Sequence, residues 1–145
     1  LESLACSFGD SAPSTPASFV STSEVICEAP VSSTTGFISV EVSANGVDFS
    51  ADNTQFRYIA PPTVVSVSPN FGVVTGGTIV TITGYNFIES SVSKCSFGSM
   101  TVAATFQSAT AVTCVSPAAS EAETTAISVT MNGVEYTTPT TSTSF

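Results

Sequence analysis

Four cysteines are the residues of this chain whose type and spacing could do chemistry. Cys6 and Cys27 lie 21 residues apart, and Cys95 and Cys114 lie 19 residues apart. A metal site would favour closer spacing and commonly histidine, and the chain has no histidine. The pattern therefore predicts two structural disulfides, each closing a loop of about 20 residues and contributing about 3 kcal/mol. Because disulfides persist in oxidising compartments, we expect an extracellular or cell-surface protein.

Catalytic groups are scarce. With no histidine, one lysine and one arginine, the chain cannot assemble a Ser-His or Cys-His nucleophile pair. Two carboxylates could act as acid and base, but the acidic residues are scattered. Glu41 is expected to face outward from a strand, and Glu121 and Glu123 are expected in a loop. The sequence predicts no enzymatic activity and no cofactor.

Oxygen ligands for a cation gather at one place only. Asp48, Asp52 and Asn53 fall within six residues and could bind Ca²⁺. The matching place in the second half of the chain offers only Glu135. We therefore favour a solvated turn over a metal site, and we expect no bound metal.

Charge excludes several classes of partner. The net charge is −9, and only 9% of residues are charged. Lys94 and Arg57 are the only cations, so the chain cannot neutralise a nucleic-acid backbone, and binding to an anionic membrane is disfavoured. The sequence has no apolar run of 18 residues, so membrane insertion is not expected. Residues 1–10 lack a signal-peptide pattern, which suggests a mature chain or an excised fragment.

The chain contains a partial copy of itself. Three motifs occur twice, at Cys6–Gly9, Cys27–Pro30 and Asn45–Phe49, and again at Cys95–Gly98, Cys114–Pro117 and Asn132–Tyr136. Their period of about 87–89 residues predicts tandem small domains, residues 1–61 and 62–145. The segment 62–94 has no counterpart before Cys6, so we expect the first domain to lack its first strands. An incomplete domain would expose apolar side chains and unpaired strand edges.

Short strands separated by turn residues dominate both copies. In the segment before Pro69, Val65 and Val67 alternate with serines and are expected to share one face. Residues 78–83 are β-branched throughout, which is typical of a strand. Asn45-Gly46 and Asn132-Gly133 are strong hairpin signals, because both positions of such a turn need positive φ. The pattern predicts an all-β fold of tandem immunoglobulin-like β-sandwiches, with the first incomplete.

Two longer motifs add a family resemblance. Residues 62–72 read Pro-Thr-Val-Val-Ser-Val-Ser-Pro-Asn-Phe-Gly, and residues 76–87 read Gly-Gly-Thr-Ile-Val-Thr-Ile-Thr-Gly-Tyr-Asn-Phe. Together with the Cys-x-Phe-Gly and Cys-x-x-Pro elements, these resemble the TIG/IPT family. The resemblance covers almost all of the second copy and the first copy from its third strand onward. It implies an immunoglobulin-like sandwich of the kind found in cell-surface receptors, large extracellular proteins, transcription factors and accessory modules of polysaccharide-degrading enzymes.

The C-terminal tail is rich in hydroxyl residues. Its composition resembles that of mucin-like stalks, so we expect O-glycosylation there. The candidate residues are Thr137, Thr138, Thr140, Thr141, Ser142, Thr143 and Ser144. The alternative is a plain polar connection. The chain has no Asn-x-Ser/Thr sequon, so N-glycosylation is not expected.

These features favour a non-catalytic, extracellular structural protein that builds a fibre, stalk or surface appendage. We expect it to associate head-to-tail with copies of itself, through the exposed faces of the incomplete first domain, or to adjoin neighbouring TIG/IPT domains. One alternative is the ectodomain of a receptor or adhesin that binds a protein or a glycan. Another is an accessory module of a secreted enzyme.

Overall fold

The computed structural model describes residues 3–9 and 13–139, which form eleven β-strands. The chain divides into two compact units, residues 1–60 and 61–145, here called the first and second unit. Both units are all-β and of immunoglobulin type, as the sequence predicts. No helix in the described ranges is long and apolar enough to cross a membrane.

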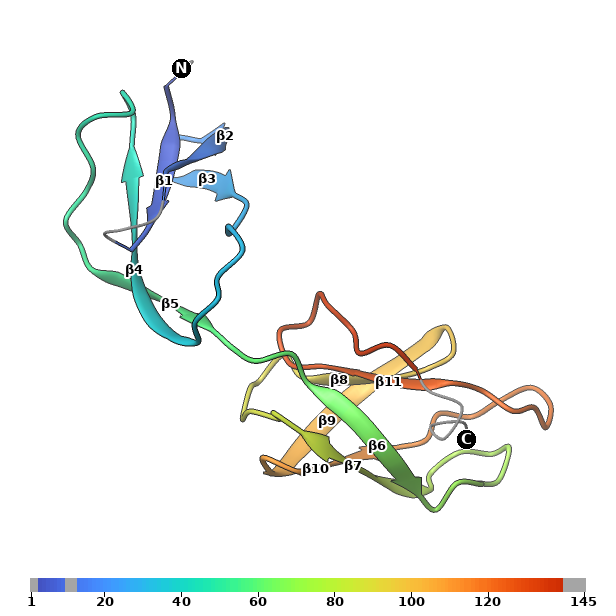
Figure 1. Cartoon of the computed structure of the whole chain (residues 1–145). Helices are drawn as coiled ribbons and strands as arrows, with labels where there is room; N and C mark the ends of the chain where they lie inside the picture. Colours follow the sequence, from blue (N-terminus) through green and yellow to red (C-terminus); the bar gives the residue numbers. More distant parts are fainter. Residues whose placement is uncertain (1–2, 10–12, 140–145) are drawn as a thin grey trace. The chain divides into compact units, whose positions relative to one another are not determined.

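The second unit is a two-layer sandwich whose strand order is β11-β8-β9-β10-β7-β6 (Figure 1). Its strands are β6 (Thr63–Ser68), β7 (Ile79–Tyr85), β8 (Lys94–Phe97), β9 (Met100–Ser108), β10 (Ala111–Val115) and β11 (Ile127–Thr130). Strand β9 belongs to both layers. Its first part, 100–103, pairs with β8, and its second part, 104–108, pairs with β10. One layer is thus β11-β8-β9, and the other is β9-β10-β7-β6.

The core of the second unit lies between these layers. Val80 and Ile82 of β7 and Ile127 and Val129 of β11 have no exposed surface, and Val112 of β10 is almost fully buried. β-Branched side chains dominate this core because they suit an extended backbone and pack well on a pleated surface.

The first unit contains five strands in the order β3-β2-β1-β4-β5. They are β1 (Ala5–Phe8), β2 (Thr15–Ser21), β3 (Glu24–Cys27), β4 (Gly36–Ser43) and β5 (Thr54–Tyr58). Each residue pair among β1 to β4 has its equivalent among β8 to β11, although the β1–β2 ladder is shorter than the β8–β9 ladder. Cys6 lies opposite Val42 in β4, for example, just as Cys95 lies opposite Val129 in β11.

The two units differ in how far the second layer extends. Where the second unit continues from β10 to β7 and β6, the first unit ends at β3 within the described residues. The consequence is visible at equivalent positions. Val129 is fully buried, but its counterpart Val42 is 36% exposed. The inner face of the β1-β4-β5 layer is thus incompletely covered.

Strand β6 corrects one expectation from the sequence. Val65 and Val67 do not share a face, because the register shifts between Val64 and Ser66. The shift leaves Val65 as an extra residue in β6 relative to β7, so buried and exposed side chains no longer alternate strictly along β6. Val64 and Val67 are the buried residues, and Val65 is half exposed.

The Asn-Gly turns also differ from expectation. Gly46 and Gly133 have positive φ, 75° and 79°, but Asn45 and Asn132 do not. The asparagines instead cap the turn with their side chains. Asn45 Oδ1 accepts hydrogen bonds from the backbone N–H groups of residues 47 and 48, at 2.9 and 2.8 Å. Asn132 does the same for residues 134 and 135.

The different burial of Val129 and Val42, which occupy equivalent positions, can be tested with the same substitution in each unit. Val129→Ala should destabilise the second unit by about 2 kcal/mol, because it removes buried methyl groups and leaves a cavity. Val42→Ala should cost the first unit less than about 1 kcal/mol, because Val42 is partly exposed. Native-state hydrogen exchange of peptides from each unit measures both effects in the intact chain. Equal losses of stability in the two units would contradict the conclusion that the inner face of the first unit is less well covered.

Candidate functional site

The cysteines join the two layers of each unit. Cys6 in β1 is bonded to Cys27 in β3, with Cα atoms 6.3 Å apart. Cys95 in β8 is bonded to Cys114 in β10, with Cα atoms 6.4 Å apart. In both units the bond passes across the strand that belongs to both layers. No cysteine of the chain is free. The four cysteines therefore act as structural links and supply no nucleophile.

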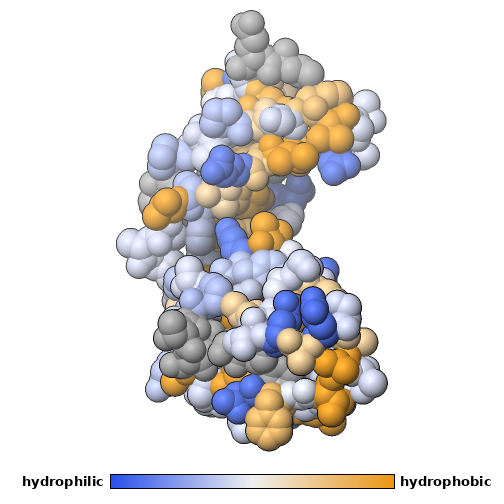
Figure 2. Space-filling view, turned by 90° about the vertical axis from the view of Figure 1, so that its right-hand side faces the viewer, coloured by the Kyte–Doolittle hydropathy of each residue, from blue (hydrophilic) through white to orange (hydrophobic). Residues whose placement is uncertain are grey.

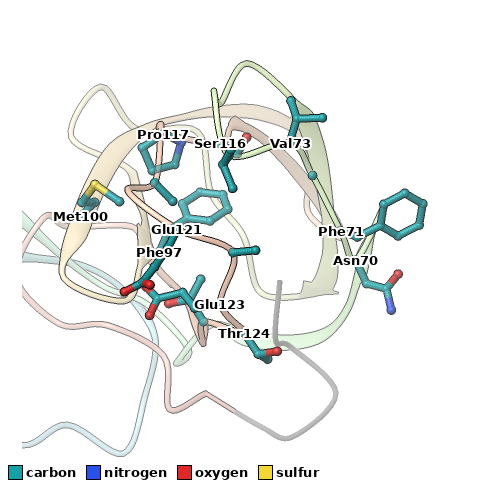
Figure 3. A pocket seen from close by; sticks show the side chains of 15 residues that line it. Asn70, Phe71, Val73, Phe97, Met100, Ser116, Pro117, Glu121, Glu123 and Thr124 are labelled. Atoms are coloured by element: carbon teal, nitrogen blue, oxygen red, sulfur yellow. The ribbon is translucent and has the colours of Figure 1, made fainter.

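A pocket of about 220 Å³ opens at one end of the second unit. It lies between the loop 70–78, the β8–β9 turn and the loop 116–125. Phe97 and Pro117 both line it, whereas the ring of Phe71 points away from the other labelled side chains in Figure 3. Phe97 is buried, and Met100 on the opposite strand is 40% exposed. The pocket is therefore a largely apolar groove with polar groups from one loop at its rim.

Backbone hydrogen bonds hold the two loops of the pocket together. The N–H of Gly77 donates to the carbonyl of Ser116 at 2.9 Å, and the N–H of Ser116 donates to the carbonyl of Thr78 at 2.8 Å. The hydroxyl of Ser116 accepts a further bond from the N–H of Thr78. Ser116 is buried and fully engaged in this loop contact. Its hydroxyl is a structural group rather than a nucleophile.

Glu121 and Glu123 are exposed residues on the rim of this pocket. Both belong to the loop 116–125, outside any strand, as the sequence predicts. Glu41 belongs to β4 of the first unit and has no part in the pocket. The pocket contains carboxylates and apolar surface, which suit binding.

The acidic turn of the first unit is organised by hydrogen bonds within the protein. Nδ2 of Asn45 donates to Oδ2 of Asp48 at 2.8 Å. In the second unit, Nδ2 of Asn132 donates to Oε2 of Glu135 at 2.6 Å. Within residues 3–9 and 13–139, no three His, Cys, Asp or Glu side chains converge as a metal site would require, and Asp48 and Asp52 are among the residues covered. These acids stabilise turns.

Thr137 has a structural role that the sequence did not reveal. It is buried, and its hydroxyl accepts a hydrogen bond from the N–H of Val129 at 3.0 Å. Ser50 makes the equivalent bond to the N–H of Val42 in the first unit. Thr138 is exposed. The other candidate glycosylation residues, Thr140, Thr141, Ser142, Thr143 and Ser144, lie outside the described residues.

The incompletely covered part of the first unit is a second candidate site. Phe19 in β2 is 52% exposed and Ile26 in β3 is 59% exposed. Figure 2 shows hydrophobic residues at the surface of both units. An aromatic cluster supports the inner face, in which the ring of Phe56 contacts those of Phe8 and Tyr58 edge-on, with centroids 5.6 and 5.1 Å apart. Phe19 is paired with the inward-facing Val25, whereas Ile26 lies on the other side of β3, so the two exposed side chains belong to opposite faces of the sheet.

Comparison with known proteins identifies the family to which the chain belongs. A family model described as IPT/TIG domain matches residues 1–58 and 62–145. Plexin-A4 of Mus musculus is 33% identical over 84 residues, which cover 56% of this chain and 4% of that protein. Plexin-A2 of Homo sapiens is 39% identical over 67 residues, which cover 46% of this chain and 4% of that protein. The chain thus spans a small fraction of the curated relatives that it matches.

Two solved structures of the full extracellular region of plexin A4 share the fold. One has a TM-score of 0.60 at 18% identity and covers 90% of this chain and 12% of that chain. The other has a TM-score of 0.54 at 26% identity and covers 81% of this chain and 12% of that chain.

The loop contact that shapes the pocket can be tested at two neighbouring glycines. Both have positive φ, so alanine at either position costs about 1 kcal/mol of backbone strain. A Cβ on Gly76 would also lie 2.7 Å from the backbone of Pro117 and Ala118, whereas a Cβ on Gly77 meets nothing within 4 Å. Gly76→Ala should therefore destabilise the second unit by at least about 1 kcal/mol more than Gly77→Ala in chemical denaturation. Equal effects would show that the close loop approach is absent in solution.

Proposed function

Because the chain belongs to the IPT/TIG domain family across both of its units, we propose that it is a structural segment of a cell-surface receptor ectodomain. In this role the two units act as spacers within a longer series of domains. The family match over both units is the observation that carries this proposal. Neighbouring IPT/TIG domains are the expected partners. We place the boundary between the two modules at residues 61 and 62.

The two disulfides fit the extracellular location that this role requires. The protein is extracellular or exposed at the cell surface, as its plexin relatives and its two disulfides indicate. Its modules are of a non-catalytic kind. O-glycans on Thr138 and on the following hydroxyl residues of the tail are part of the proposal, since the tail composition favours them.

A domain exchange tests the structural role. In mouse plexin-A4, the matching segment is replaced with residues 62–145 of this chain. The chimera should reach the cell surface within about twofold of the unmodified protein, because the same fold fills the same place. Surface labelling measures the amount, and ligand binding by the other domains should be retained.

The control is the same chimera with Cys95→Ser and Cys114→Ser. Losing the disulfide costs about 3 kcal/mol and should reduce the surface amount severalfold. A chimera that reaches the surface normally but no longer binds the plexin ligand would contradict a purely structural role. It would show that the replaced segment makes specific contacts.

Head-to-tail self-association is a second candidate function, which would make the protein a fibre or stalk component. The incomplete coverage of the first unit favours it, because Val42 and Phe19 leave apolar surface exposed. A surface of this kind is a common site of protein association. A contact between different surfaces of two copies does not close on itself, so it would extend into a filament.

Sedimentation velocity of the intact chain and of residues 62–145 tests this candidate. If self-association operates, the intact chain should form concentration-dependent oligomers, and the fragment should stay folded and monomeric because it lacks the first unit. Circular dichroism establishes that the fragment is folded. An intact chain that remains monomeric at high concentration, or a fragment that polymerises equally well, would rule out the first unit as the joint.

A further inference from the structure

The two Asn-Gly turns have nearly the same local sequence. Residues 44–48 read Ala-Asn-Gly-Val-Asp, and residues 131–135 read Met-Asn-Gly-Val-Glu. The side-chain amide of an asparagine can be attacked by the backbone nitrogen of the next residue, and glycine hinders this approach least because it has no Cβ. Because the local sequences are so alike, a difference between the turns in this reaction must come from the fold.

The side-chain oxygen of Asn45 is surrounded by hydrogen-bond donors. The hydroxyl of Ser43 donates to Asn45 Oδ1 at 3.0 Å, in addition to the N–H groups of residues 47 and 48 at 2.9 and 2.8 Å. Ser43 is 1% exposed, so its hydroxyl is held in place by the surrounding structure. Attack on Cγ of the amide places negative charge on this same oxygen. The three donors are therefore arranged to stabilise that charge, as the donors of an oxyanion hole do.

The carboxylate of Asp48 holds the other end of the amide. Nδ2 of Asn45 donates to Oδ2 of Asp48 at 2.8 Å. This bond keeps the amide oxygen toward the three donors and the amide nitrogen, which is the leaving group, toward an exposed side chain. The amide of Asn45 is thus held in one orientation before any reaction begins.

The two turns differ at the attacking nitrogen. In the second unit the N–H of Gly133 donates to Oγ1 of Thr130 at 3.0 Å. In the first unit the hydroxyl of Ser43 instead accepts a bond from the N–H of Asn45 at 3.3 Å. Among residues 3–9 and 13–139, the N–H of Gly46 has no hydrogen-bond partner. Gly46 is also exposed, whereas Gly133 is half-buried, so a base from solvent removes the proton of the Gly46 N–H more easily.

We propose that Asn45 is a site of spontaneous deamidation promoted by its folded turn, and that Thr130 suppresses the same reaction at Asn132. Hydroxide takes the proton of the Gly46 N–H, this nitrogen forms a bond to Cγ of Asn45, and the Cγ–Nδ2 bond breaks. The leaving nitrogen takes a proton from water and departs as ammonia, which leaves a cyclic succinimide. Water then opens the ring at either carbonyl and yields aspartate or isoaspartate at position 45.

The modification changes the turn in which it occurs. Both products remove the amide that donates to Asp48 at 2.8 Å and add a carboxylate close to it. Like charges at such a separation repel, so the modified turn is weaker and carries one more negative charge. This modification site goes beyond the spacer role of the chain and does not depend on it.

Timed incubation of the intact chain at mildly alkaline pH tests the proposal. Peptide mapping by mass spectrometry follows the loss of each amide, and enzymatic methylation of isoaspartate identifies the second product. Asn45 should react about fivefold faster than Asn132, which is the effect of one neutral hydrogen bond on the attacking N–H. In the reduced and denatured chain the two asparagines should react at equal rates, and Asn45 should react no faster there than in the folded chain.

Exchanging the two hydroxyl residues provides matched variants. Ser43→Thr and Thr130→Ser each keep a hydroxyl beside the turn, but the methyl group of threonine restricts the side chain to fewer rotamers. Ser43→Thr should slow the reaction of Asn45 about fivefold, and Thr130→Ser should accelerate that of Asn132 about fivefold. Hydrogen exchange of residues 42–50 and 129–137 establishes that each variant is folded, and the second variant stands as a test if the first is not.

Three results would overturn the proposal. Equal rates at the two asparagines of the folded chain would show that the free N–H of Gly46 is without effect. A faster reaction of Asn45 in the denatured chain would show that its turn protects the amide rather than promoting attack. Unchanged rates in a folded Thr130→Ser variant would show that the hydroxyl of Thr130 does not suppress the reaction.

Discussion

The need to cover an apolar sheet face is the constraint on which the rest of this structure depends. A β-sheet with branched side chains on one face is stable in water only when a second layer packs against that face. In the second unit β7 and β6 complete this layer, and Val129 loses all contact with solvent. In the described part of the first unit the second layer ends at β3, and Val42 in β4 retains 36% exposure although it pairs with Cys6 as Val129 pairs with Cys95. The difference between the two units is therefore one of coverage and not of strand pairing.

The elements that do not depend on coverage are the same in both units. Each disulfide links the two layers across a strand that belongs to both. Each asparagine turn is closed by side-chain hydrogen bonds to its own backbone. A hydroxyl from Ser50 or Thr137 then satisfies the N–H of the valine on the neighbouring strand. These local links hold β1 to β4 in the same register as β8 to β11. They do so although the described part of the first unit has no strands equivalent to β7 and β6.

The functional interpretation follows from the same contrast. The family match and the plexin relatives support a receptor ectodomain, which was the alternative to a fibre-forming protein in the sequence-based hypotheses. The pocket of the second unit contributes apolar surface and two carboxylates, Glu121 and Glu123, without a nucleophile. Apolar surface beside carboxylates suits interaction with other molecules.

The sequence by itself determined the fold class, the tandem repeat and the family, because period-two patterns, paired cysteines and turn residues are local signals. It also anticipated that the first unit would expose apolar surface. Tertiary structure alone decided which valines of β6 are buried, since the register shift near Val65 depends on pairing with β7. It also decided that Asn45 caps its turn through its side chain, and that Thr137 is buried. The pocket could not be predicted, because it depends on which segments distant in sequence lie side by side.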